Sequence, residues 1–254
     1  MEENRRDKEY TEGIKVSGGF LGWLDNYWYH YKWPTIVVCF FLIVGLIGGL
    51  QMCNRESEDL IILYSGSAAL SAKDADDICA VIAGIVNEDF DGDGNKNFAM
   101  SKYNILSEEQ IREEKKKTDE NGKPIFVDTN YYTSQSATYH SYIQTGESSV
   151  AFLEPWLYEA LIANPDPEKV RLQKLSDVLG YVPDSACGEY GIRLGDTELY
   201  RDYGVMRNMP ADTVICLFKP LWKGGKSSKE EFYAREKKTF IAIVEYGADT
   251  QSDT

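Results

Sequence analysis

The sequence predicts an α/β fold, with a largely parallel sheet flanked by helices, preceded by one amino-terminal transmembrane helix. Two observations lead to this prediction. The stretch from Trp33 to Asn54 contains no charged residue. After it, short apolar runs alternate with helical patterns, which is typical of βαβ units and hence of parallel strands. A chain of 254 residues is long enough for one such domain and an accessory segment.

The charge-free stretch is long enough to cross a bilayer. At about 1.5 Å per residue a helix of this length spans a hydrocarbon core of roughly 30 Å. Aromatic residues that favour the headgroup level precede it, namely Trp23, Tyr27, Trp28, Tyr29, Tyr31 and Trp33. A buried core helix rarely stays uncharged for so long. A cleaved signal peptide fits less well because no small-x-small cleavage site is evident, and a lipidated Cys53 fits poorly after Met52.

Basic residues predict the orientation of this anchor. Before it stand Arg5, Arg6, Lys8, Lys15 and Lys32, whereas only Arg55 and then Lys73 follow closely. The positive-inside rule therefore places the amino terminus in the cytoplasm. The predicted organisation is a cytoplasmic segment (1–32), an uncleaved signal anchor in the cell membrane (33–54), a tether (55–58), an extracytoplasmic α/β domain (59–248) and a disordered tail (249–254).

The first half of the α/β domain is expected to hold three strands and three helices. Residues 61–67, "IILYSGS", read as a buried strand, and Ser71 with Asp74 forms a capping box for an amphipathic helix. A second strand is expected at 97–106. Ser107 and Gln110 then cap a short helix within a polar, solvated insertion. A strand at 124–129 and a polar, aromatic helix ending at Gly146 follow.

The second half continues the alternation. Residues 148–154, "SSVAFLE", read as a buried strand, and Pro155 starts a helix. Residues 168–180, "EKVRLQKLSDVLG", follow this helix after two prolines. Strands are expected at 190–197 and 212–220. The last helix has an apolar face in which Glu236 is the polar exception.

Three stretches resemble the extracytoplasmic solute-binding proteins with the type 2 periplasmic-binding-like fold. They are "IILYSGS" with its capped helix, "YIQTGESSVAFLEPWLYEAL", and the aromatic start "DNYWYHYKWPTIV", which is similar to that of small membrane-tethered bacterial proteins. The resemblance covers residues 59–246. It implies a membrane-tethered binding module that captures a small solute or peptide. The alternative is a degenerate solute-binding-like domain that serves as a structural or interaction part of a membrane complex.

Candidate ligand-binding residues follow from the strand ends. In open α/β sheets, ligands bind where loops and helix amino termini meet the carboxyl ends of strands. This rule selects three groups: Tyr64, Ser65, Gly66 and Ser67; Thr133, Ser134 and Gln135; Glu154 and Trp156. The plainer interpretation is that Ser-Gly-Ser makes a turn and that Trp156 packs in the core.

Charge and motifs narrow the function further. The net charge of −14 argues against a nucleic-acid partner, because phosphate binding needs an excess of Lys and Arg. Cationic ligands, or solubility alone, fit this charge better. The chain has two histidines and no GxSxG, HExxH or GxxxxGK[ST] motif. We therefore expect no catalysis. The expected partners are the lipid bilayer, a small solute or peptide, and a membrane protein.

Residues 88–97, "EDFDGDGNKN", resemble the start of a calcium-binding loop. Asp89, Asp91 and Asp93 stand at positions 1, 3 and 5 of the D-x-D-x-D-G pattern, and Gly94 supplies the turn at position 6. Asn95 and Asn97 fall at positions 7 and 9. Position 12 is Met100 instead of the bidentate glutamate. We expect a weak, structural Ca²⁺ site, and the alternative is a solvated turn.

Overall fold

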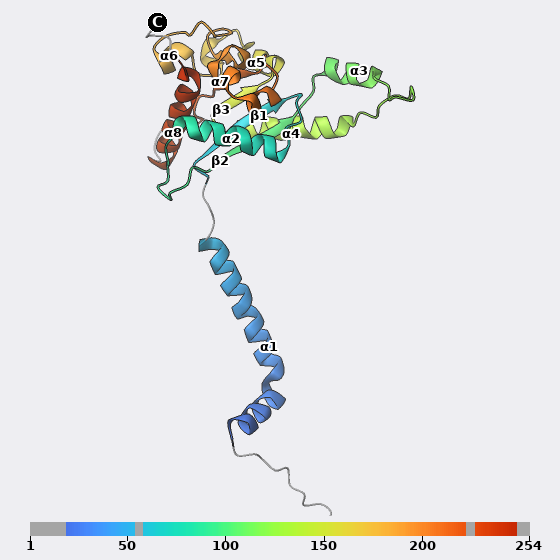
Figure 1. The fold of residues 1–254 in the computed structure, drawn as a ribbon, viewed down its shortest axis with the longest axis vertical. Coiled ribbons are helices and arrows are strands. Elements are labelled where there is room, and N and C mark those ends of the chain that lie inside the picture. Colours follow the sequence, from blue (N-terminus) through green and yellow to red (C-terminus); the bar gives the residue numbers. More distant parts are fainter. Residues whose placement is uncertain (1–18, 54–57, 222–226, 248–254) are drawn as a thin grey trace, which may run out of the picture. The chain divides into compact units, whose positions relative to one another are not determined.

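The computed structural model describes residues 19–53, 58–221 and 227–247 (Figure 1). The chain divides into two compact units, Met1–Glu56 and Ser57–Thr254. The basic residues before position 19 that predict the membrane orientation, and the predicted tail at 249–254, lie outside the described residues.

The described part of the first unit, from residue 19 to residue 53, forms the helix α1 (Phe20–Cys53). Its stretch Asn26–Gly49 is long and apolar enough to cross a membrane, and none of that stretch is buried. The coarse expectation of one amino-terminal apolar helix of spanning length is confirmed. Its length and composition favour a membrane anchor and leave the orientation open.

The second unit, hereafter the α/β unit, is built on one five-stranded sheet. Its strands are β1 (Leu60–Gly66), β2 (Phe98–Asn104), β3 (Val150–Leu153), β4 (Gly191–Arg193) and β5 (Val214–Leu217), in the order β2-β1-β3-β5-β4. β1 runs parallel to β2 and to β3. β5 runs antiparallel to β3 and to β4.

The predicted α/β class is confirmed, but the prediction of a largely parallel sheet is wrong. Arg193 at the end of β4 pairs with Val214 at the start of β5. The segment between them therefore returns to the end of the sheet that it left, and contains only the short helices η2 (Leu194–Asp196), α7 (Glu198–Asp202) and η3 (Gly204–Asn208). A parallel neighbour would need a connection that crosses the whole sheet. The sheet is consequently mixed.

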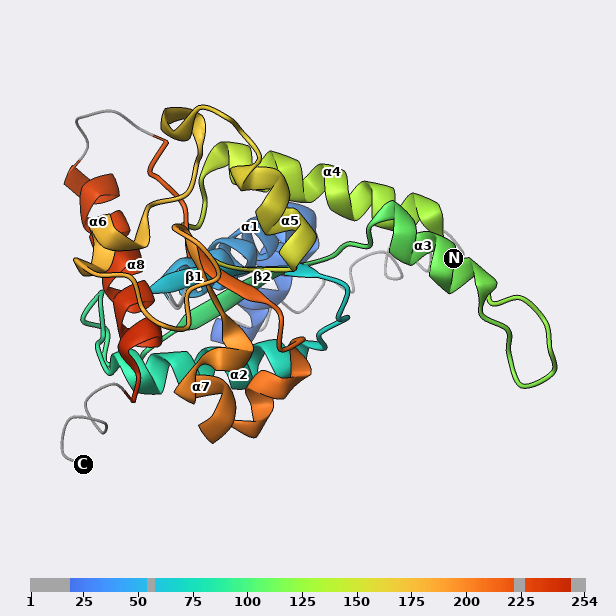
Figure 2. The ribbon, with the colours of Figure 1, turned by 90° about the horizontal axis from the view of Figure 1, so that it is seen from above.

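Helices cover both faces of the sheet, as Figure 2 shows. On one face, Ile62 and Phe152 pack in a cluster with Ile78 of α2 (Ala72–Val86) and Phe240 of α8 (Ser227–Glu245). On the other face the core cluster contains side chains of β1, β3, α4 (Thr129–Thr145) and α5 (Pro155–Ile162), among them Leu63, Ala151, Tyr139 and Leu157. Alternate strand residues face opposite layers, so both layers are apolar.

Local capping signals predicted several helix ends correctly. Ser71 and Asp74 form the reciprocal capping box of α2. Ser107 and Gln110 do the same for α3 (Glu108–Lys116). α4 ends at Gly146, whose φ of 67° lies in the left-handed region that glycine adopts without strain.

One expectation fails where a local apolar run lacks a partner. The predicted strand at 124–129 is absent: Pro124 makes only an isolated bridge to Thr118, and Phe126 is 87% exposed. This loop and α3 project from the sheet (Figure 1). The segment 168–180 forms only the end of η1 (Pro167–Lys169), a bridge from Leu172 to Phe218, and α6 (Leu175–Leu179).

Candidate functional site

The carboxyl ends of β1 and β3 meet at Glu154, as the sequence predicts. The Glu154 backbone N–H donates to the Ser65 carbonyl at 2.9 Å. Its Oε2 accepts a hydrogen bond from the Ser67 backbone N–H at 2.6 Å, and its Oε1 accepts one from the Gln110 side-chain amide. Glu154 is only 9% exposed. One buried carboxylate therefore joins the turn after β1, the start of α5 and the projecting helix α3.

The turn after β1 has room for glycine alone. A Cβ on Gly66 would lie 2.9 Å from the Tyr64 hydroxyl oxygen and 3.3 Å from Glu154 Oε2. From the other side, the Asn104 side-chain amide donates to the carbonyls of Ser67, at 2.8 Å, and Gly66, at 3.3 Å. Burial raises the pKa of the Tyr64 hydroxyl, which stays protonated. The turn is thus held in place by hydrogen bonds with the side chains of two other segments, Glu154 and Asn104.

Two pockets flank this turn, and together with it they form what we call the strand-end site. The larger, of about 640 Å³, lies between the turn, α3 and the start of α5; it is lined by Ser67, Ala68, Leu106, Ser107, Glu109, Gln110, Glu113, Glu114, Lys117 and Trp156. The smaller, of about 220 Å³, is lined by Tyr64, Ala68, Ala69, Leu70, Lys102, Asn104, Tyr131 and Gln135. Ala68 borders both.

Of the nine residues predicted as ligand-binding, four line these pockets, namely Tyr64, Ser67, Gln135 and Trp156, and Glu154 bonds the turn between them without lining either pocket. Ser65 and Gly66 are buried in the strand end, and Gln135 faces the smaller pocket. Thr133 and Ser134 are exposed on α4, line neither pocket, and the Thr133 hydroxyl bonds back to the Thr129 carbonyl.

Gln110 was expected only as a helix cap, yet it has two roles. Its Oε1 accepts from the Ser107 backbone N–H at 2.7 Å, while its side-chain N–H donates to Glu154. A glutamate would satisfy the capping box equally well. It would, however, place a second carboxylate against Glu154, so the glutamine is the sequence signal for this contact.

The larger pocket is acidic and has one aromatic wall. Three of its lining residues are glutamates, Glu109, Glu113 and Glu114, against one lysine, Lys117, which pairs with Glu114. The Trp156 indole N–H is buried and has no hydrogen-bond partner among the described residues. Such a surface favours a ligand that carries an amine and an apolar or planar body.

The aspartate loop is tied to the start of β1 by a residue that sequence analysis missed. Asp59 is 1% exposed, and its carboxylate accepts three backbone hydrogen bonds at 3.0 Å, from Phe90, Asp91 and Asn97. The sequence signal that could have identified Asp59 is its position directly before a buried strand. Because three N–H groups meet its charge, Asp59 holds the loop in place by itself.

The proposed metal ligands are only partly brought together. Carboxylate oxygens of Asp59, Asp89 and Asp91 lie within 4.8 Å of one another. Asp93 is outside this group, and its Oδ1 accepts from the Asn95 N–H at 2.7 Å. Asp89 accepts from Gly92 and Gly94, and these hydrogen bonds lower its pKa. Three hard oxygens fit a Ca²⁺ ion, while the loop is also satisfied as a series of turns.

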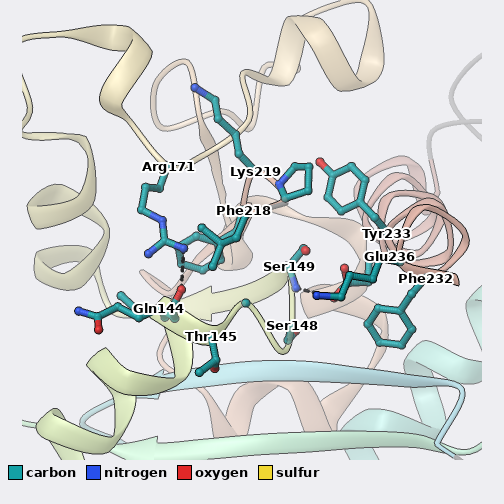
Figure 3. A pocket seen from close by; sticks show the side chains of 15 residues that line it. Gln144, Thr145, Ser148, Ser149, Arg171, Phe218, Lys219, Phe232, Tyr233 and Glu236 are labelled. Atoms are coloured by element: carbon teal, nitrogen blue, oxygen red, sulfur yellow. Dashed lines mark hydrogen bonds between the residues drawn. The ribbon is translucent and has the colours of Figure 1, made fainter. Parts of the chain in front are cut away.

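A third pocket, of about 460 Å³, lies at the opposite end of β3 and was not expected (Figure 3). We call it the basic pocket, because three of its four charged lining residues are cationic. It is lined by Ile143, Gln144, Thr145, Gly146, Ser148, Ser149, Arg171, Phe218, Lys219, Pro220, Leu221, Lys229, Phe232, Tyr233 and Glu236. The polar exception in the apolar face of the last helix, Glu236, was the one sequence signal for it.

Among the described residues, Glu236 is the only carboxylate in the wall of the basic pocket. It is 2% exposed and accepts the Ser149 backbone N–H at 2.5 Å. Burial raises its pKa to about 7, and the bonds from Ser149 counteract only part of that effect. Thr239, one turn along α8, has a buried hydroxyl with no partner among the described residues.

The three cysteines Cys79, Cys187 and Cys216 and the single histidine of the α/β unit, His140, line none of these pockets. Burial raises the pKa of Cys79 to about 12 and also raises that of Cys216, so both thiols stay protonated at neutral pH. His140 is exposed on α4 and lines none of the three pockets.

Comparison with known proteins finds no match for the chain among protein-family models, curated proteins or solved structures. The similarity to solute-binding proteins therefore stays a hypothesis that rests on the residue patterns given above.

Proposed function

We propose that the chain is a membrane-tethered, non-catalytic binding module that captures a small solute or peptide at the strand-end site. The observation that carries the proposal is the convergence on Glu154. Side chains and backbone from β1, α3 and α5 meet there, and pockets open on both sides of the turn. Rigid strand ends that present loops to a pocket are the usual place for ligands in α/β sheets.

The proposal includes the cellular arrangement. The apolar helix α1 would anchor the chain in the cell membrane, with the basic amino-terminal segment in the cytoplasm and the α/β unit outside. Protease added to intact cells should then remove the α/β unit and spare an amino-terminal tag. Loss of the tag with retention of the α/β unit would show that the chain has the opposite orientation in the membrane.

The acidic larger pocket suggests the first ligands to test. We expect lysine, arginine and dipeptides that contain them to bind more tightly than neutral amino acids or monosaccharides, because three glutamates line the pocket. Isothermal titration of the full chain in a neutral detergent measures this. Equal or absent binding of all these compounds would refute the proposed site.

Trp156 supplies the matched test. If its ring contacts the ligand, Trp156→Ala should weaken binding by about 0.5–1.5 kcal/mol beyond the loss of buried area. Tyr181→Ala is a suitable control, because Tyr181 is an exposed aromatic residue that lines none of the three pockets. Unchanged affinity in Trp156→Ala, with the fold intact, would assign Trp156 to the core.

We also propose a weak structural Ca²⁺ site at the aspartate loop, with Asp59 added to the residues that the sequence suggested. The three clustered carboxylates support it. Its role would be to stiffen the connection between α2 and β2. With Met100 inside β2, opposite Ile62, no glutamate closes the loop as in tighter sites. A dissociation constant on the order of 10⁻⁴ to 10⁻³ M is expected.

A second function, as an interaction domain of a membrane complex, is favoured by the projecting loop. Phe126 is 87% exposed and Ile125 44% exposed, beside the polar helix α3. Exposed aromatic side chains on a projection are common at protein contacts. Phe126→Ser should abolish photo-crosslinks to a membrane protein if this function holds, and should leave binding at the strand-end site unchanged.

A further inference from the structure

The basic pocket concentrates positive charge in an acidic chain. Its cations come from three separate segments: Arg171 before the bridge at Leu172, Lys219 after β5, and Lys229 on α8. Ion pairs among the described residues involve none of these three side chains. The chain as a whole carries a net charge of −14, so unpaired cations here are not a consequence of composition.

The backbone holds two of these cations opposite each other. Leu172 and Phe218 form an antiparallel bridge, and the Lys219 N–H donates to the Arg171 carbonyl at 2.6 Å. Arg171 and Lys219 are therefore cross-strand neighbours of like charge, an arrangement that is unfavourable unless an anion lies between them. Figure 3 shows Lys219 extending outward at the rim, above the Arg171 side chain.

The Arg171 guanidinium is held in place, but not all of its N–H groups have a hydrogen-bond acceptor in the part of the chain that the structure describes. Its Nη2 donates to the Ile143 carbonyl at 2.6 Å, and its guanidinium carbon lies 6.0 Å from the centre of the Phe218 ring. Its Nε is buried and has no partner among the described residues. These contacts hold the planar guanidinium in one orientation, with donor capacity left for an acceptor on a ligand.

Three aromatic rings supply much of the apolar part of the lining, beside the polar residues Ser149 and Glu236. Phe218 lies on the Arg171 side of Ser149, and Phe232 and Tyr233 lie on the other side with Glu236 (Figure 3). The Tyr233 hydroxyl is bonded to the Gln173 amide at 2.8 Å, which fixes its ring. A pocket that presents cations together with aromatic rings suits an amphipathic molecule.

We propose that the basic pocket binds a small organic anion, a carboxylate or phosphate headgroup on an apolar body. The headgroup contacts Arg171 and Lys219, and the body packs between Phe218, Phe232 and Tyr233. This site lies at the opposite end of β3 from the strand-end site and takes a ligand of opposite charge. It does not depend on the function proposed above.

The experiment is calorimetric titration of the full chain, in a neutral detergent, with benzoate, phenyl phosphate and the uncharged benzyl alcohol at millimolar concentrations. We expect benzoate or phenyl phosphate to bind at least tenfold more tightly than benzyl alcohol, because a charge-assisted pair is absent from the alcohol. The tighter of the two anions identifies the headgroup. Equal affinity for all three compounds, or no binding of either anion, overturns the proposal.

Variants locate the binding. Arg171→Gln and Lys219→Gln should each weaken anion binding about tenfold. Lys219→Gln is the variant expected to fold normally, because no hydrogen bond or ion pair of the Lys219 side chain is found among the described residues. Lys169→Gln is the charge-matched control: Lys169 is exposed, pairs with Asp166 and lines none of the pockets described. If Lys169→Gln weakens binding as much as Lys219→Gln, the anion binds by general attraction and the pocket is not its site.

Discussion

Two carboxyl side chains are buried at the amino ends of neighbouring parallel strands, and their surroundings differ. Asp59, before β1, is 1% exposed and accepts three backbone hydrogen bonds. Glu236, against the start of β3, is 2% exposed and accepts one backbone hydrogen bond, from Ser149. Burial raises the Glu236 pKa to about 7. At equal burial, the two carboxylates therefore differ in the number of N–H donors that face them, and fewer donors compensate less of the cost of burying a carboxylate.

Glu154, at the carboxyl end of β3, lies between Asp59 and Glu236 in the number of hydrogen bonds that its carboxylate accepts. It is 9% exposed and accepts one backbone and one side-chain hydrogen bond. The comparison predicts that isosteric amides act in opposite directions: an asparagine at position 59 should destabilise the chain, whereas a glutamine at position 236 should stabilise it at alkaline pH.

The largest effect is expected for Asp59→Ala, which removes the shared acceptor of three backbone N–H groups. We expect a loss of about 3–5 kcal/mol in the free energy of unfolding, since hydrogen bonds to a charged group are the strong ones. Asp59→Asn should lose less, because one oxygen remains. Denaturant unfolding followed by tryptophan fluorescence measures both. Asp93→Ala is the control, because Asp93 is exposed. Faster hydrogen exchange at Phe90, Asp91 and Asn97 should accompany only the Asp59 variants.

Glu236 should make stability depend on pH. Its pKa is raised from an ordinary 4.5 to about 7, so the folded state holds the proton more tightly than the unfolded state. The stabilising contribution is complete below pH 4.5 and is lost as the pH rises through about 7, a change on the order of 3 kcal/mol.

The matched variant isolates this dependence. Glu236→Gln cannot ionise, so its advantage over the unmutated chain should grow between pH 4.5 and 8. The difference between their two stability curves cancels every other titrating group. If the difference in the free energy of unfolding stays constant or falls as the pH rises, burial does not raise the pKa of Glu236. The contrast with Asp59 would then be wrong.

Glu154→Ala should cost about 2 kcal/mol, between the other two carboxylates in donors lost. The Ser67 N–H and the Gln110 amide lose their shared acceptor. Glu159→Ala, on the exposed side of the same helix, should change stability little. Gln110→Glu should destabilise the chain although it preserves the helix cap, because it sets two carboxylates together. A neutral result for Gln110→Glu would show that the contact between α3 and the strand ends contributes nothing.

The smallest effect is expected from calcium. At about tenfold excess over its dissociation constant, an ion that binds only the folded state adds about 1.4 kcal/mol by mass action. Millimolar Ca²⁺ should therefore raise the melting temperature of the chain, and Asp91→Ala should abolish the rise. If neither Ca²⁺ nor Mg²⁺ moves the melting curve, Asp59 alone holds the loop and no ion contributes.

The sequence alone determined the features that depend on neighbouring residues. The charge-free helix, the capping boxes at Ser71 and Ser107, the end of α4 at Gly146 and the start of α5 at Pro155 follow from contacts within a few positions of each other. The strand-end rule also selected Ser67, Glu154 and Trp156 correctly as neighbours, since parallel strands bring their ends to one edge.

Only the tertiary structure decided the rest, because it depends on residues far apart in the chain. The direction of β5 follows from how the chain returns after β4, and no local pattern encodes that return. Asp59 meets the aspartate loop about 30 residues on, Gln110 reaches Glu154 across 44 residues, and Ser149 reaches Glu236 across 87. Local propensity carries no information on such pairs: packing of the two helical layers on the sheet brings them together, and burial then raises the pKa of Glu236.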